Sequence, residues 1–151
     1  SHLAVAGAGF AAGIYVLPIL TAPPAPDHEA VMQAARSSEF VGVFSRERKD
    51  SDALHWGEGE ISIGPDVISF AGRLAPGPDY RLYLSPEFVE TEADFNRLKP
   101  SMVQVGEVRT FENFMLPLPA GIDPSAYSAA IVWCESFGQF ITSGSYERRA
   151  R

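Results

Sequence analysis

Hydrophobic residues form one long uninterrupted run at the start of the chain and many short runs after it. The long run, Leu3 to Leu20, contains only apolar residues, Gly, Tyr and Pro. A helix of this length, at about 1.5 Å per residue, just spans a hydrocarbon layer of about 30 Å. A cleaved signal peptide usually has a shorter apolar region, and the prolines that follow leave no clear cleavage site. We therefore expect residues 1–20 to be an uncleaved membrane anchor, with a cleaved signal helix or a buried core helix as alternatives.

The next segment, residues 21–38, predicts a spacer followed by a short helix. Three prolines between residues 23 and 26 are typical of a stiff, extended linker that would hold a domain off the bilayer. In residues 28–38, Val31, Ala34 and Ala35 follow one another at helical spacing. We expect a short connecting helix there.

From Phe40 onward the pattern changes to short apolar runs rich in Val, Ile, Tyr, Phe and Trp, which favour strands. The candidates are Phe40–Phe44, Leu54–Ile63, Val67–Ala71, Tyr80–Leu84, Met102–Val108, Phe111–Leu116, Tyr127–Cys134 and Phe137–Thr142. Turn residues, such as the ProGlyProAsp of residues 76–79, separate them. We expect an all-β domain over residues 39–147, an antiparallel β-sandwich or barrel of about eight short strands. One helical interruption is predicted at Glu92–Leu98, and residues 148–151 form a basic tail.

Charge is confined to the part of the chain that follows the apolar run. Residues 1–26 contain no Asp, Glu, Lys or Arg, so the net charge of −7 belongs to the remainder. An acidic surface repels phosphate backbones, because nucleic-acid binding requires Lys and Arg to replace condensed counterions. We therefore expect no nucleic-acid partner.

The usual catalytic motifs are missing from the sequence. It contains no G-x-S-x-G elbow, no H-E-x-x-H and no Walker-type phosphate loop. With one cysteine, the chain can form neither an intramolecular disulfide nor a C-x-x-C zinc or dithiol site, and C-x-x-C-H for covalent haem is absent. No metal site is predicted.

The single cysteine, Cys134, ends the most apolar of the predicted strands. If the strand alternates, Cys134 shares a face with Val132 and Ala130, while Trp133 lies on the opposite face with Ile131. Both faces are apolar, so the strand is expected to be central and buried on both sides. A thiol in such surroundings has a raised pKa and is inert unless a cationic neighbour favours the thiolate. The neighbouring Glu135 has the wrong charge for that, so both a core and a redox role stay open.

His55 is the only histidine within the predicted β-region. Its imidazole is a candidate axial haem ligand or a hydrogen-bond partner to a sulfur, and it can equally be a half-buried residue at the start of a strand. Glu58 and Glu60 follow it at a spacing that places both on one strand face, which is usually a solvated one.

From about Phe40 to Tyr146 the chain resembles the DM-thirteen domain, the "electron transfer" module found beside DOMON domains in animal Skeletor-type proteins and alone in bacterial exported proteins. The matching segments are PheValGlyValPhe (40–44), HisTrpGlyGluGlyGlu (55–60), GlyProAspTyrArgLeuTyrLeuSer (77–85), ValGlyGluVal (105–108) and IleValTrpCysGluSerPheGlyGlnPheIle (131–141). The last segment departs from the family pattern where ThrSerGlySer (142–145) follows it, at a point where members often carry small residues such as Ala-Ala.

The resemblance implies a β-sandwich-like domain with a redox role. Its signature cysteine aligns with Cys134, which would act as a bare thiol or as a ligand to a prosthetic group such as haem. Its histidine position aligns with His55, and Trp133 would belong to the same cofactor-binding region. Five aromatic residues could wrap a flat macrocycle or could equally form the ordinary core: Phe111, Phe114, Trp133, Phe137 and Phe140.

Two functional hypotheses follow. In the first, the chain is an extracytoplasmic redox or electron-transfer domain, on the periplasmic or extracellular side, anchored through residues 3–20 and centred on Cys134. Its partner would be a redox protein or a membrane electron carrier. In the second, it is a non-catalytic β-sandwich binding module in which Cys134 is a core residue. Both describe a module rather than a stand-alone enzyme.

Overall fold

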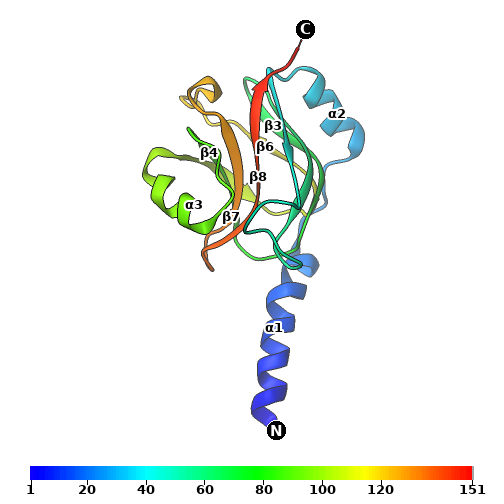
Figure 1. The fold of residues 1–151 in the computed structure, drawn as a ribbon. Helices are drawn as coiled ribbons and strands as arrows, with labels where there is room; N and C mark the ends of the chain where they lie inside the picture. Colours follow the sequence, from blue (N-terminus) through cyan, green and yellow to red (C-terminus); the bar gives the residue numbers. More distant parts are fainter. Residues whose placement is uncertain (151) are drawn as a thin grey trace.

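Eight antiparallel strands form one sheet that curls into a nearly closed barrel, in the order β5-β4-β7-β8-β1-β2-β3-β6. The computed structural model describes residues 1–150 and is shown in Figure 1. The end strands β5 and β6 contact each other, which nearly closes the barrel. The strands are β1 (Phe40–Phe44), β2 (Gly57–Ile63), β3 (Val67–Leu74), β4 (Tyr80–Ser85), β5 (Val103–Val108), β6 (Glu112–Pro117), β7 (Ala129–Cys134) and β8 (Gln139–Arg148). The expected all-β class and strand number are confirmed.

Three α-helices accompany the barrel, each close to where the pattern predicts it. They are α1 (His2–Thr21), α2 (His28–Arg36) and α3 (Glu92–Leu98), with 3-10 turns at Lys99–Ser101 and Pro124–Ala126. Asp27 caps α2 by accepting a hydrogen bond from the backbone N–H of Ala30 at 2.8 Å, and the side chain of Thr91 caps α3 in the same way. Helix α2 packs beside β3 and β6, whereas α1 projects from one end of the barrel (Figure 1).

The barrel has a core inside it and a second hydrophobic cluster outside it. The inner core contains large apolar side chains from most strands, among them Phe44, Phe70, Leu82 and Ile141. The outer cluster lies under α3, where Phe95 and Leu98 cover one face of the sheet. A strand between two apolar layers is buried on both faces. Strand β7 lies between these two layers, and every one of its residues is buried.

Strand β7 shows the alternation that its sequence predicts. Ala130, Val132 and Cys134 point into the inner core, while Ile131 and Trp133 join the outer cluster.

The long strand β8 joins the two halves of the sheet. It pairs with β7 up to Ser145 and with β1 from Tyr146 to Arg148. A Cβ on Gly144 would collide with the backbone carbonyl of Val43, so the missing side chain permits the close approach at this crossing. The predicted strand ended at Thr142 and was too short, because the polar sequence ThrSerGlySer carries no apolar signal although three of its residues are buried and paired.

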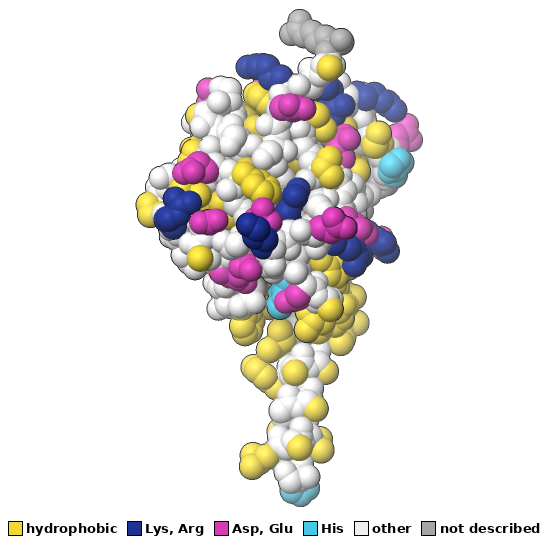
Figure 2. Space-filling model, in the orientation of Figure 1, with side chains coloured by type: hydrophobic (Ala, Val, Ile, Leu, Met, Phe, Trp, Pro, Cys, Tyr) yellow, Lys and Arg dark blue, Asp and Glu magenta, His cyan; other side chains and the backbone are white. Residues whose placement is uncertain are grey.

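Hydrophobic side chains cover α1 and gather at the end of the barrel that it joins (Figure 2). Charged side chains are spread over the rest of the visible body. Helix α1 is long and apolar enough to cross a membrane, none of its 18-residue apolar window is buried, and a signal sequence has the same properties.

Candidate functional site

A cavity of about 370 Å³ lies where α1 meets the end of the barrel. Its wall combines α1 with residues from β4, β7, β8 and the loops beside them, which are far apart in the sequence. The lining residues are Ala11, Ile14, Tyr15, Leu54, His55, Pro76, Gly77, Pro78, Tyr80, Cys134, Phe137, Gln139 and Ile141. The lining contains no Asp, Glu, Lys or Arg.

Cys134 lies in this wall between two paired strands. Strand register places it opposite Tyr80 of β4 and Gln139 of β8, and all three residues line the cavity. The residue is only 3% exposed, and its Sγ donates a hydrogen bond to the carbonyl oxygen of Pro78 at 3.0 Å. The thiol is therefore held at the boundary between the barrel core and the cavity.

The loop before β4 positions that carbonyl. Asp79 has a left-handed backbone (φ 59°), a conformation that Asp adopts more readily than most residues, and its carbonyl accepts a hydrogen bond from the backbone N–H of Glu135 at 3.0 Å. The Asp79 carboxylate also accepts hydrogen bonds from Arg81 at 2.6 Å and from the hydroxyl of Ser136. These bonds tie the loop to the residues that follow Cys134.

The surroundings of Cys134 favour the protonated thiol. Burial raises the pKa of Cys134, and the negative charges of Asp79 and Glu135 raise it further, against the opposing effect of nearby backbone N–H groups. The side chain of Glu135 points to the other face of the sheet, where it accepts hydrogen bonds from Lys99 Nζ and the Tyr83 hydroxyl, each at 2.7 Å. The cationic neighbour that would stabilise a thiolate is not in the cavity lining.

His55 lies in the loop before β2, which begins at Gly57 rather than at the predicted Leu54. Its Nδ1 lies 2.9 and 3.0 Å from the two carboxylate oxygens of Asp52. Although burial opposes it, hydrogen bonds from His55 and from the Leu54 backbone hold the pKa of Asp52 below its usual value. With Nδ1–H directed to this carboxylate, the neutral imidazole keeps Nε2 as its acceptor nitrogen.

The structure brings two of the three predicted site residues together. Cys134 and His55 line one cavity, whereas Trp133 lies on the opposite face of β7. Its ring stacks on Phe95 with the centroids 3.8 Å apart. Trp133 therefore does not contribute to the cavity.

The aromatic pocket expected for a macrocycle is not formed. Phe111 and Phe114 belong to the inner core, Trp133 and Phe140 belong to the outer cluster, and Phe137 is 52% exposed. The sheet separates these side chains, because neighbours along a strand point to opposite faces.

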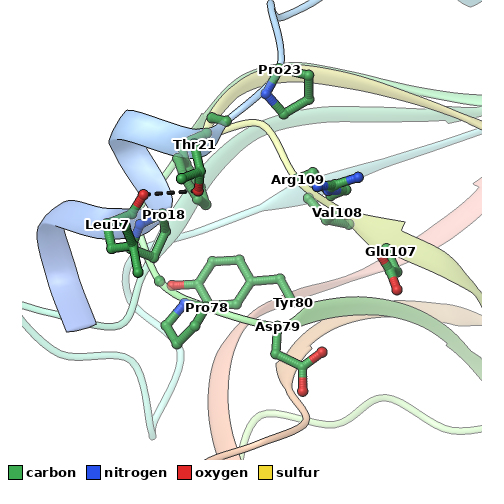
Figure 3. A pocket seen from close by; sticks show the side chains of 13 residues that line it. Leu17, Pro18, Thr21, Pro23, Pro78, Asp79, Tyr80, Glu107, Val108 and Arg109 are labelled. Atoms are coloured by element: carbon green, nitrogen blue, oxygen red, sulfur yellow. Dashed lines mark hydrogen bonds between the residues drawn. The ribbon is translucent and has the colours of Figure 1, made fainter. Parts of the chain in front are cut away.

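A second cavity, of about 420 Å³, lies on the other side of Tyr80. Figure 3 shows Tyr80 between the end of α1, represented by Leu17 and Pro18, and the end of β5, represented by Glu107, Val108 and the following Arg109. Asp79, Glu107 and Arg109 line this cavity together with α1. The end of α1 and the first proline after it, Pro23, thus line a cavity together with barrel residues, and the distance of the domain from a bilayer stays a prediction. The last turns of α1 therefore lie against one end of the barrel.

Within residues 1–150, no group of three or more His, Cys, Asp or Glu side chains is arranged to hold a metal ion. Glu58 pairs with Arg46 at 2.9 Å and with Arg73 at 3.3 Å, and Glu60 pairs with Arg149 at 3.4 Å. These two carboxylates balance arginines on the outside of the barrel.

Sequence reasoning missed the contributions of Tyr80, Pro78 and α1 to the site. The signal for Tyr80 and Pro78 was present, since both lie in the segment 77–85 that carries the family pattern. No pattern in the sequence indicates that Ile14 and Tyr15 line the cavity, because their contribution depends on how α1 meets the barrel.

Comparison with known families identifies the domain. Residues 44–146 match the family described as "Electron transfer DM13", and the match includes both Cys134 and His55. No curated protein and no solved structure matched the chain. Since the match covers more than half of the sequence, this protein belongs to the electron transfer DM13 family and is a redox-related module.

Proposed function

We propose that this protein is a membrane-anchored electron-transfer domain whose redox-active group is the thiol of Cys134. The observation that carries the proposal is the shared cavity, whose lining includes both the single cysteine and the only histidine of the domain. Residues 1–20 would be the anchor, residues 21–38 the linker and residues 39–147 the redox domain, on the extracytoplasmic side of the membrane.

The reaction requires a base, because a cysteine is oxidised through its thiolate and the Cys134 environment favours the thiol. His55 is the one imidazole in the cavity lining, and imidazole is the side chain that most often serves as a general base. We assign it that role, with Asp52 orienting the ring through Nδ1. The thiolate then attacks one sulfur of a partner's disulfide and forms a mixed disulfide. The partner's other sulfur leaves as a thiolate with the electron pair of the broken bond.

The residues of the site do not fit a haem. A thiolate ligand would need a nearby positive charge to offset its burial, and the aromatic side chains that would enclose a macrocycle lie on opposite faces of the sheet. We therefore assign the redox role to the sulfur itself, with a redox protein or a membrane electron carrier as its partner.

The proposal is tested by equilibrating the full chain in detergent micelles with buffers of 2-mercaptoethanol and its disulfide in graded ratios. Intact-mass spectrometry reports the fraction of chains carrying one mixed disulfide. We expect this fraction to rise and fall reversibly with the buffer ratio, and to be zero in Cys134→Ala. A folded wild-type chain that stays unmodified at every ratio would support the binding-module alternative, in which Cys134 is only a core residue.

The role of His55 has its own readout in the same assay. His55→Gln retains a side chain that can hydrogen-bond to Asp52 but cannot accept a proton at neutral pH. We expect the approach to equilibrium to slow while the final fraction of mixed disulfide is unchanged. Trp56→Phe, next in the sequence and not in the cavity lining, is the matched control and should leave the rate unchanged. Equal rates in wild type and His55→Gln would remove His55 from the mechanism.

A further inference from the structure

The end of the barrel that surrounds the Cys134 cavity carries exposed hydrophobic side chains. Leu54 is 61% exposed and Phe137 is 52% exposed, and both line the cavity together with α1. We call these two residues and the adjoining Pro76–Pro78 segment the rim. Exposed apolar residues grouped around an opening usually mark a surface that contacts something apolar.

The position of α1 shows what the rim contacts. The rim lies beside Ala11, Ile14 and Tyr15, near the middle of the apolar segment. About seven residues, or roughly 10 Å of helix, separate Ala11 from Pro18. If residues 3–20 cross the hydrocarbon layer, a rim beside residues 11–15 cannot stand clear of the bilayer.

The polarity of the barrel end changes along α1 in the direction that a bilayer requires. Beside residues 11–15 the cavity lining contains no charged side chain. Beside residues 17–23, toward the end of the helix, the second cavity is lined by Asp79, Glu107 and Arg109. Among the residues that line the two cavities, charged side chains thus lie toward the headgroups and water, and apolar ones lie deeper, where charges are costly. The carboxylate next to the deeper cavity, that of Asp52, is paired with His55 at 2.9 Å.

We propose that the rim is immersed in the bilayer, so that the Cys134 cavity opens toward lipid rather than toward water. This inference rests on the membrane anchoring in the proposed function and adds to it the class of molecule that reaches the thiol. A cavity without charged side chains that opens into lipid admits uncharged, lipid-dissolved molecules and excludes charged ones.

The test places a nitroxide label at position 54 or 137, using Leu54→Cys or Phe137→Cys in a Cys134→Ala background. The full chain is reconstituted in phosphatidylcholine vesicles. Val43→Cys is the matched control, because Val43 is 59% exposed but lines no cavity with α1. Collision of each label with oxygen, which concentrates in hydrocarbon, is compared with its collision with a water-soluble nickel chelate.

We expect labels at positions 54 and 137 to collide mainly with oxygen, and the label at position 43 to collide mainly with the nickel chelate. Labels at 54 and 137 that are as accessible to the chelate as the label at 43 would overturn the inference. Cys134→Ser supplies a second background if the alanine variant does not fold. Because the labels do not depend on the chemistry of Cys134, the inference and the proposed redox role can fail independently.

Discussion

At the scale of single residues, two features fix the position of the Cys134 thiol. The alternation of β7 points it into the inner core, on the face opposite Trp133. Its hydrogen bond to the Pro78 carbonyl joins residues 56 positions apart, next to the left-handed backbone of Asp79.

That hydrogen bond predicts an order of stability among substitutions. Cys134→Ala leaves the Pro78 carbonyl without its donor and should lower the free energy of unfolding by about 1–3 kcal/mol. Cys134→Ser keeps a donor in nearly the same place and should cost less. Urea unfolding of the full chain in detergent micelles measures both. A serine variant less stable than the alanine variant would contradict a stabilising hydrogen bond from residue 134 to the Pro78 carbonyl.

The raised pKa of Cys134 predicts a pH dependence of stability. The unfolded thiol loses its proton above about pH 8.5, while the folded thiol keeps it to a higher pH. The contribution of Cys134 to stability is therefore full below pH 8.5 and is lost as the pH rises from there through the folded pKa.

Unfolding free energies of wild type and Cys134→Ala, measured from pH 7 upward, check this. The difference between the two should shrink as the solution becomes alkaline. Burial, which raises the pKa of Tyr80 most, acts in both proteins, whereas the smaller effect of Cys134 on Tyr80 is absent from the alanine variant. A difference that is constant with pH would show that the folded thiol titrates as the unfolded one does.

At the scale of secondary-structure elements, the sequence predicts most of the fold, and the errors have local causes. The strand β1 and the helix α3 have the predicted bounds. Helix α3 could not be assigned a partner from its sequence, because the face that it covers is formed by strands on either side of it in the chain. The residues around His55 look like a strand but form a loop held by Asp52, which accepts two backbone N–H bonds at 2.8 Å.

The separation of the outer cluster from the cavity predicts that stability and redox behaviour can be altered independently. Trp133→Ala removes the ring that stacks on Phe95 and should lower the free energy of unfolding by about 3–5 kcal/mol. The midpoint of the mixed-disulfide equilibrium should not change in the chains that remain folded. Phe137→Ala, which removes an exposed aromatic ring, should cost less than about 1 kcal/mol in the same unfolding experiment. A shift of the mixed-disulfide midpoint in folded Trp133→Ala would show that Trp133 contributes to the redox site.

At the scale of the whole molecule, the sequence separates an apolar helix from a β-domain but does not predict how the two meet. Composition alone identifies α1 as an apolar helix of membrane-spanning length. The sequence pattern interprets the proline segment as a spacer and does not indicate that α1 shares a cavity wall with the barrel. A contact between distant segments of this kind leaves no periodic signal in the sequence.

This arrangement predicts a strong dependence of Cys134 reactivity on the charge of the reagent. In phosphatidylcholine vesicles, the uncharged aromatic disulfide 4,4′-dithiodipyridine should react faster than the dicarboxylate 5,5′-dithiobis(2-nitrobenzoate). We expect the uncharged reagent to react roughly tenfold faster or more. A tenfold ratio of rates corresponds to about 1.4 kcal/mol of free energy that disfavours entry of the charged reagent. Phe137→Asp should reduce the ratio by placing a charge on the rim, whereas Val43→Asp should not. Equal rates for both reagents in the wild type would indicate a cavity open to water.

The central claim, that Cys134 is a redox-active thiol and not only a core residue, is tested most directly by counting reactive thiols in the native state. The full chain in vesicles is treated with 4,4′-dithiodipyridine, and the released pyridinethione is measured by absorbance, first in the native protein and then after unfolding in guanidinium chloride. We predict that the folded wild type releases one pyridinethione per chain and that Cys134→Ala releases none. A folded wild type that releases none, and releases one only after unfolding, would contradict the claim.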